Sequence, residues 1–324
     1  MVYKKIPEAL LASLQADFHV TCFDAIDSAN QARFVEAIRH ADGLLGASVT
    51  LTPAMLEPAT RLKIISTISV GVDQFDVDYL TRRGILLVNT PDVLTEATAD
   101  TIFALVMATA RRVVELANYV KAGKWTGSVD KAHYGVNVHG KTLGVIGMGR
   151  IGSAVARRAH LGFGMDVLYY NRSPAPEAEA AYDAKAVPLD TLLARADFVC
   201  VVLPLTAATD RLIGKRELAL MRPEAIFING ARGRIVDEAA LIDALRAGRL
   251  RAAGLDVFER EPLPADSPLL AMDNVVALPH IGSATHETRL AMATLAVENL
   301  RAGLRGEVPR YLVNAPLNNM GEKS

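Results

Sequence analysis

The chain has little cysteine, no excess of either charge and no long apolar run. Its two cysteines, Cys22 and Cys200, are too few for a disulfide scaffold, and the opening MVYKKIPEAL lacks the apolar segment of a signal peptide. We therefore expect a reducing, cytoplasmic location. The 35 basic and 36 acidic side chains leave a net charge of -1, which argues against binding to nucleic acid or to an anionic membrane. No apolar run reaches the roughly 18 residues that span a bilayer.

Short apolar segments alternate with helical patterns along the chain, which predicts parallel α/β layers. Up to about residue 89 the expected strands are residues 18–23, 43–46, 63–68 and 85–88. A long helical segment should then run from about Thr95 to Gly123. A second strand series begins with TLGVIG at Thr142 and continues through VLYY, FVCVVL, AIFIN, AAGLDVF and NVVAL. A last helix is expected over residues 284–304, followed by a polar end, residues 317–324, that should fray.

The length of 324 residues is about twice that of an ordinary domain, so two domains are expected. The second strand series begins only at Thr142, and the last helix lies beyond the final strand of that series. The sequence therefore predicts an outer domain made of residues 1–97 and 285–324, with a dinucleotide-binding domain of residues 98–284 inserted between them.

A glycine-rich string directly follows the apolar strand TLGVIG and opens a helical pattern. In a dinucleotide-binding turn the first glycine permits the tight turn, the second lets backbone N–H groups approach a pyrophosphate, and the third lets helix and strand pack closely. A tight turn without a ligand is the alternative. The strand, turn and helix order favours a cofactor site formed by Gly147, Met148, Gly149, Arg150, Ile151 and Gly152.

The next strand ends in Tyr170, Asn171, Arg172 and Ser173, where an NAD-binding chain would carry an acid for the ribose hydroxyl. Asp166 stands at the opposite end of that strand, so no carboxylate is in position. A guanidinium and a hydroxyl can instead donate hydrogen bonds to a 2′-phosphate. These residues predict NADPH rather than NADH, the alternative being an arginine that is simply solvated.

Three ionisable residues each follow an apparent strand of the second series: Arg232, Glu261 and His280. Because the carboxyl ends of parallel strands meet at one edge of a sheet, these side chains can converge where the cofactor binds. A carboxylate can orient an imidazole and favour its charged form, and a guanidinium can bind a substrate carboxylate through two hydrogen bonds. The set predicts acid–base chemistry on a small carboxylate substrate.

These strings, together with STISVGVDQFDVD and TEATADTIFALVMATARR, resemble the D-isomer-specific 2-hydroxyacid dehydrogenases over nearly the whole chain. The resemblance implies two doubly wound parallel-sheet domains, a Rossmann domain inserted in a flavodoxin-like substrate domain. It implies NADPH-dependent reduction of a small 2-keto acid, such as glyoxylate, hydroxypyruvate or 2-keto-D-gluconate, to the D-2-hydroxy acid. It also implies a homodimer, with residues 98–121 and the following loop as the interface.

The resemblance assigns roles to single residues. Arg232 would bind the carboxylate and polarise the keto group, Glu261 would pair with His280, and His280 would donate the proton. A loop of the outer domain would contact the substrate carboxylate through the backbone N–H groups of Ser69, Val70 and Gly71. Residues around the nicotinamide and its ribose would be Thr98, Pro204, Ala231, Asp256 and Gly282.

The chain departs from the family pattern in two places. The family usually opens with a fuller apolar strand, whereas here only Val2 and Tyr3 stand between Met1 and Lys4, so we expect either a short first strand or a misplaced start codon. The loop of residues 128–138 carries His133 and Tyr134, where specificity residues of the family cluster.

Other functions are weighed against this one. They are an NAD-dependent dehydrogenase of another substrate, a non-catalytic nucleotide-sensing protein, and a methyltransferase, which would not need the Arg, Glu and His set. No metal site is expected, because the spacing of His280, His286 and Glu287 fits no helical zinc motif. Cys200 should be a buried small hydrophobe, and Trp125 a packing or interface residue.

Overall fold

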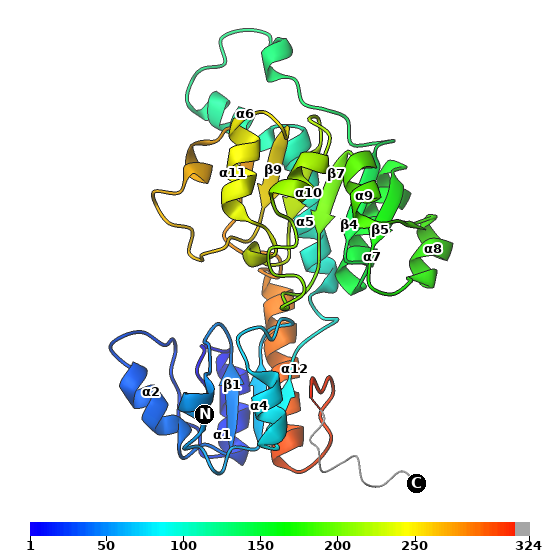
Figure 1. The fold of residues 1–324 in the computed structure, drawn as a ribbon. Helices are drawn as coiled ribbons and strands as arrows, with labels where there is room; N and C mark the ends of the chain where they lie inside the picture. Colours follow the sequence, from blue (N-terminus) through cyan, green and yellow to red (C-terminus); the bar gives the residue numbers. More distant parts are fainter. Residues whose placement is uncertain (315–324) are drawn as a thin grey trace. The chain divides into compact units, whose positions relative to one another are not determined.

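The computed structural model describes residues 1–314; the polar end predicted to fray and the last ten residues of the predicted outer domain lie outside the described residues. The chain forms two compact units (Figure 1). The first unit comprises Met1–Leu94 and the segment from Ala284 onward, and the second comprises Thr95–Ser283. Each unit is built on a parallel sheet with helices packed against it, so the predicted α/β class is confirmed.

The sheet of the first unit has three parallel strands in the order β1 (Gly43–Gly46), β2 (Ile64–Thr67) and β3 (Leu86–Val88). Val2 bridges Cys22 and Leu45, so the first strand is as short as expected. The strand predicted over residues 18–23 is wrong, since only this one-residue bridge forms there. The opening segment offers too few residues to pair with: two backbone hydrogen bonds involve Val2, and one more joins the Lys5 N–H to the Asp24 carbonyl just beyond the predicted strand.

Helices surround this small sheet. They are α1 (Glu8–Asp17), α2 (Gln31–Ile38), α3 (Pro53–Leu56), α4 (Val77–Arg82) and α12 (His286–Leu304). Helix α1 packs on α12 rather than on the strands. Helix α12 lies against the strands, where the buried Ser66 hydroxyl donates to the Ala296 carbonyl at 2.7 Å. It begins two residues later than predicted, because Thr285 is its N-cap and accepts a hydrogen bond from the Thr288 N–H at 3.1 Å.

The second unit contains seven parallel strands in the order β10-β9-β8-β7-β4-β5-β6. Their bounds are β4 (Thr142–Ile146), β5 (Asp166–Tyr170), β6 (Lys185–Ala186), β7 (Phe198–Val201), β8 (Ile226–Asn229), β9 (Ala252–Leu255) and β10 (Val275–Ala277). Every strand predicted for this series is present. Strand β6 was missed because its two residues are exposed and carry no apolar signal. The chain order reverses between β4 and β7, and sheets of this topology bind ligands at the carboxyl ends of the strands beside such a reversal.

Buried side chains on both faces of this sheet pack against helices. On one face Phe198 and Cys200 lie in a core with α5 (Thr95–Ala110), α7 (Arg150–Arg157) and α8 (Pro176–Tyr182). On the other face Val199 and Val201 pack with α9 (Leu189–Arg195), α10 (Lys215–Leu220) and α11 (Glu238–Arg246). This alternation along one strand is what a strand buried on both faces requires.

The long helix predicted from Thr95 to Gly123 is divided into α5 and α6 (Val113–Lys121). Arg112 between them adopts a left-handed backbone with φ 54°, which interrupts the helix. The last residue of α5, Ala110, is bonded by the loop after α6, because the Val136 N–H donates to the Ala110 carbonyl at 2.8 Å. The Arg112 guanidinium also bonds Glu115 and the Ala132 carbonyl, so the returning loop ends the helix where periodicity alone would continue it.

Candidate active site

The glycine-rich turn stands at the carboxyl end of β4 and leads into α7. Gly147 has φ 107°, a conformation that L side chains rarely adopt, and a Cβ there would lie 2.7 Å from the Val202 carbonyl oxygen. A Cβ at Gly152 would lie 2.1 Å from the Gly147 carbonyl oxygen. The turn and the first turn of α7 are therefore packed directly on each other, which requires glycine at both positions.

Gly149 differs from these two glycines because a Cβ there would have nothing within 4 Å. It is the N-cap of α7, so the space beside it adjoins the first backbone N–H groups of the helix. Met148 is buried in the core, so its side chain points away from that space. The packing does not demand glycine at 149, but an anion binding closely to the backbone would.

The end of β5 places Asn171, Arg172 and Ser173 after the strand, and Asp166 is its first residue. The Asn171 side-chain amide donates to the Ser173 carbonyl at 3.0 Å and closes a small turn. Arg172 and Ser173 are exposed. The segment from Tyr170 to Ser173 thus offers donors and carries no carboxylate.

Glu261 and His280 are brought together, as the sequence predicted from their places after β9 and β10. His280 Nδ1 lies 2.7 Å from Glu261 Oε2, and the second carboxylate oxygen accepts the Phe258 N–H at 3.1 Å. Burial raises the pKa of Glu261, but the hydrogen bond and charge of His280, the Phe258 N–H and the Arg232 charge outweigh burial and leave that pKa below its ordinary value. The carboxylate is therefore ionised at neutral pH, and it leaves Nε2 as the imidazole nitrogen free of Glu261.

The loop that carries His280 is held by Asp256, which is only 3% exposed. Its carboxylate oxygens accept the Ile281 N–H at 2.7 Å and the Gly282 N–H at 2.8 Å. Burial is the largest influence on the pKa of Asp256 and leaves it above its ordinary value, although these two N–H groups and the His280 charge act in the opposite direction. His280 itself has φ 54°, so this clasp stabilises a backbone conformation that is unfavourable for a side-chain-bearing residue.

Two other predicted cofactor residues lie near this clasp or the neighbouring turn. A Cβ at Gly282 would lie 3.2 Å from the Thr98 side chain, which places Thr98 of α5 beside Asp256 and Gly282. Ala231 donates its N–H to the Asn229 side chain at 3.1 Å, and Asn229 donates to the Arg232 carbonyl at 3.0 Å. The buried Asn229 therefore shapes the turn that presents Arg232.

The turns bearing Arg232 and Glu261 are packed on each other. A Cβ at Gly233 would lie 1.8 Å from the Phe258 carbonyl carbon, so the chain after Arg232 touches the chain that leads to Glu261. The Arg232 guanidinium donates to the Ala231 carbonyl at 2.9 Å. Pro204 follows β7, and its carbonyl accepts the Thr209 hydroxyl at 2.7 Å. Arg232, Glu261, His280 and Pro204 thus all follow parallel strands of one sheet.

Ser69, Val70 and Gly71 follow β2 in the first unit and form one turn. The Ser69 hydroxyl donates to the Gly71 carbonyl at 2.8 Å, and Asn89 donates its side-chain amide to the Val70 carbonyl at 2.8 Å. Sequence reasoning missed Asn89 and Asn229. Each is a polar residue at or just after the carboxyl end of a buried strand, and that position was the available signal.

The loop after α6 contains the remaining predicted residues. His133 lies 3.0 Å from the Asp130 carboxylate and packs against the Tyr119 ring, while Tyr134 and Trp125 are exposed. Cys200 is fully buried, and burial raises the pKa of its thiol to about 12. In the described part of the chain no group of three His, Cys, Asp or Glu side chains could hold a metal ion. None of the described helices is both long and apolar enough to cross a bilayer.

The model of the D-isomer specific 2-hydroxyacid dehydrogenase NAD binding domain matches residues 103–282. The chain belongs to this family, which confirms the resemblance stated above. Glyoxylate/hydroxypyruvate reductase B of Escherichia fergusonii is 55% identical over 314 residues, 97% of each chain, and the protein of that name from an Enterobacter species is 54% identical over 318 residues, 98% of each chain.

Solved structures agree with the two-domain Rossmann architecture. The TT0316 protein of Thermus thermophilus is 42% identical, with a TM-score of 0.89 over 96% of this chain and 98% of that one. An NADPH-dependent glyoxylate/hydroxypyruvate reductase of Sinorhizobium meliloti, in complex with NADP and malonate, is 34% identical, with a TM-score of 0.86 over 96% of this chain and 95% of that one.

Proposed function

We propose that the chain reduces a small 2-keto acid to the D-2-hydroxy acid with NADPH. The observation that carries this proposal is the pair of His280 and Glu261, 2.7 Å apart, on the sheet edge that also bears Arg232 and the glycine-rich turn. The names of the relatives, glyoxylate/hydroxypyruvate reductases, support glyoxylate and hydroxypyruvate as substrates. 2-Keto-D-gluconate is a further candidate.

The nicotinamide supplies a hydride to the keto carbon when it is bound, and negative charge then develops on the keto oxygen. His280 donates a proton to that oxygen from Nε2, because Nδ1 is engaged by Glu261. Arg232 binds the substrate carboxylate and stabilises the developing charge. Glu261 keeps the imidazole oriented and favours its protonated form.

NADPH is proposed over NADH because Arg172 and Ser173 are exposed donors and no carboxylate stands at the end of β5. A carboxylate there would repel a 2′-phosphate and favour a ribose hydroxyl instead. The open space at Gly149 supports pyrophosphate binding to the backbone. The proposed cofactor residues are Thr98, Gly147, Met148, Gly149, Arg150, Ile151, Gly152, Asn171, Arg172, Ser173, Pro204, Ala231, Asp256 and Gly282.

We assign NADP binding to residues 98–284 and a substrate role to residues 1–97 and 285–324. Ser69, Val70 and Gly71 are the proposed contacts of the outer domain with the substrate carboxylate. The Val70 carbonyl already accepts the Asn89 amide, which fixes the peptide groups of this turn and supports their use as N–H donors.

We further propose a homodimer formed through residues 98–121 and the loop after them, with α6 and that loop supplying the exposed surface. No side chain of α6 is buried, although Val113, Val114 and Val120 are apolar, and Trp125 beyond it is 62% exposed. Such an apolar surface is typical of an interface. Light scattering at micromolar protein should give twice the chain mass, and a monomer would contradict this part of the proposal. A cytoplasmic location is proposed from the two free cysteines.

The deciding experiment mixes the pure protein with NADPH and either glyoxylate or hydroxypyruvate and follows the loss of NADPH absorbance. We expect turnover that the His280→Ala variant loses. If NADPH binds but no keto acid is reduced, the nucleotide-sensing alternative is favoured. If neither NADPH nor NADH binds, both the reductase and the nucleotide-sensing protein are ruled out.

A further inference from the structure

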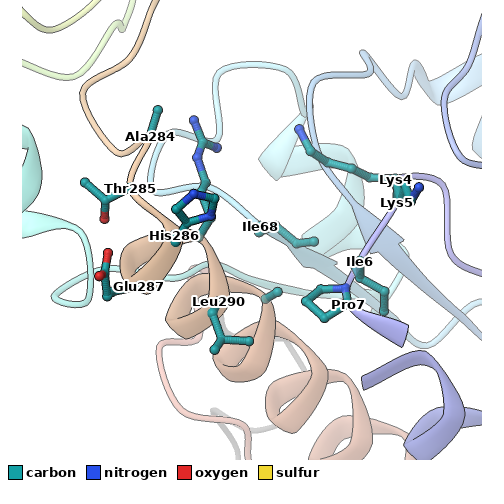
Figure 2. Close-up of a pocket in the computed structure, with 12 residues that line it drawn as sticks. Lys4, Lys5, Ile6, Pro7, Ile68, Ala284, Thr285, His286, Glu287 and Leu290 are labelled. Atoms are coloured by element: carbon teal, nitrogen blue, oxygen red, sulfur yellow. The ribbon is translucent and has the colours of Figure 1, made fainter. Parts of the chain in front are cut away.

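A cavity of about 560 Å³ lies in the first unit beside the start of α12 (Figure 2). Ile68 and Leu290 contribute apolar lining, and Ile68 follows β2 whereas Leu290 is on α12. Basic side chains from two segments far apart in the sequence also line the cavity: Lys4, Lys5, His286 and Arg289. The volume lies within the range of small-molecule sites.

Lys4 and Arg289 face this cavity with like charges close together. Burial lowers the pKa of the half-buried Lys4, and the positive charge of Arg289 lowers it further. No carboxylate among the described residues forms an ion pair with either side chain. Arg301, further along the same helix, pairs with Asp17 at 2.7 Å, so the lack of a partner is specific to the cavity end of α12.

Glu287 also borders the cavity but does not neutralise this pair. Figure 2 shows it at the Thr285 end, with His286 between it and Lys4. The Lys4 side chain extends over the side of the cavity where Ile68 lies. Two unneutralised cations therefore adjoin an apolar surface, an arrangement that costs free energy in the empty protein.

We propose that this cavity binds a small organic anion, a carboxylate or phosphate attached to an apolar group. Lys4 and Arg289 contact the charged group, and Ile68 and Leu290 contact the apolar part. The anion neutralises two mutually repelling cations, and its apolar part covers Leu290, which is 51% exposed. This site goes beyond the proposed function: it lies in the unit given a substrate role, but none of the single residues proposed to contact NADPH or the keto acid lines the cavity.

The test is calorimetric titration of the full-length protein with phenyl phosphate, benzoate and inorganic phosphate. We expect phenyl phosphate or benzoate to bind more tightly than inorganic phosphate, and the better of the two identifies the anionic group. The double variant Lys4→Gln/Arg289→Gln should weaken that binding by about tenfold or more. Lys4→Arg, which keeps the charge, should retain it.

The matched control is Lys63→Gln/Arg82→Gln, which removes the same charges from exposed positions of the same unit outside the cavity. It should change the affinity less than twofold. Leu290→Asp places a negative charge at an exposed lining position, where folding is not at risk, and should also weaken binding by about tenfold. Circular dichroism checks that each variant is folded.

Arg232→Ala separates this inference from the proposed function, because it removes the cation assigned to the keto acid. Binding of the probe should persist in this variant. The inference is overturned if neither organic probe binds the wild-type protein, if inorganic phosphate binds equally well, if the control double variant loses as much affinity, or if Arg232→Ala abolishes binding. NADPH oxidation by the wild-type protein tests the proposed function independently.

Discussion

Asp256 accepts hydrogen bonds from the two backbone N–H groups that directly follow His280. Both carboxylate oxygens accept backbone N–H groups, from Ile281 at 2.7 Å and from Gly282 at 2.8 Å, and these directly follow the left-handed residue His280. The carboxylate comes from the end of β9, whereas the loop follows β10, so the clasp joins neighbouring strands at the sheet edge. The orientation of the proposed proton donor thus depends on a residue that the family resemblance places near the nicotinamide.

The first prediction concerns this clasp. Asp256→Asn keeps one acceptor oxygen but leaves one buried N–H group without its partner, so the free energy of unfolding should fall by about 1–3 kcal/mol. Turnover should fall with it, since the His280 backbone is released. Urea unfolding measures the first effect and NADPH oxidation the second. Wild-type stability together with wild-type turnover would show that the loop is held in another way.

Two glycines of the turn give a matched pair of variants. Gly152→Ala places a Cβ 2.1 Å from the Gly147 carbonyl oxygen and should destabilise the fold by about 1–3 kcal/mol. Gly149→Ala meets nothing within 4 Å and should leave stability unchanged while weakening NADPH binding. Thermal unfolding and cofactor titration separate the two effects. Unchanged NADPH affinity in a folded Gly149→Ala protein would argue against pyrophosphate binding at this turn.

The sequence predicted the second unit better than the first. Fully buried parallel strands such as β7 and β8 are nearly continuous apolar runs, and such runs are visible in the sequence without any partner. The strand expected over residues 18–23 failed because strand formation depends on what pairs with it, and Val2 offers a single bridge. The break at Arg112 could not be predicted, because it depends on the Val136 N–H, which reaches Ala110 only in the folded chain.

In the site, too, the sequence revealed the features that follow from strand positions but not those that depend on contacts in the folded chain. Arg232, Glu261 and His280 could be named because each follows a recognisable strand, and strand ends share an edge. Asn229 and Asn89 were missed because their role lies in the carbonyl and N–H groups that they bond, which no spacing along the chain reveals.

Cofactor preference is tested with Arg172→Asp. The change replaces an exposed donor for a 2′-phosphate by an acceptor for a ribose hydroxyl, so kcat/KM should fall for NADPH and be kept or improved for NADH. Arg249→Asp makes the same charge change at another exposed position of the second unit and should leave the ratio unaltered. An unchanged cofactor ratio in Arg172→Asp would remove the basis for preferring NADPH.

Glu261→Gln should change two pH profiles. The pKa of Glu261 is lower in the folded protein than its ordinary value, so its ionised form stabilises the fold above the ordinary pKa, and this contribution is lost as the pH falls through the lowered value. The stability difference between wild type and Glu261→Gln should therefore shrink in acid. The pH optimum for keto acid reduction should also move to lower pH, because the imidazolium loses its neighbouring negative charge. Parallel urea titrations and rate profiles check both, and an unmoved optimum would deny Glu261 its proposed electrostatic role.

The sharpest prediction concerns His280 and Arg232. Charge develops on the keto oxygen during hydride transfer, so a proton donor and a cation must both act there. His280→Ala should lower kcat about 10²- to 10⁴-fold, the range expected for loss of a general acid, with NADPH binding intact. Arg232→Ala should instead impair both KM and kcat, because its contacts serve carboxylate binding and the transition state together. Steady-state kinetics with glyoxylate and hydroxypyruvate, alongside cofactor titration, distinguish the two patterns. Near wild-type turnover by a His280→Ala protein that still binds NADPH would transfer the proton-donor role to Tyr134 or to a bound water.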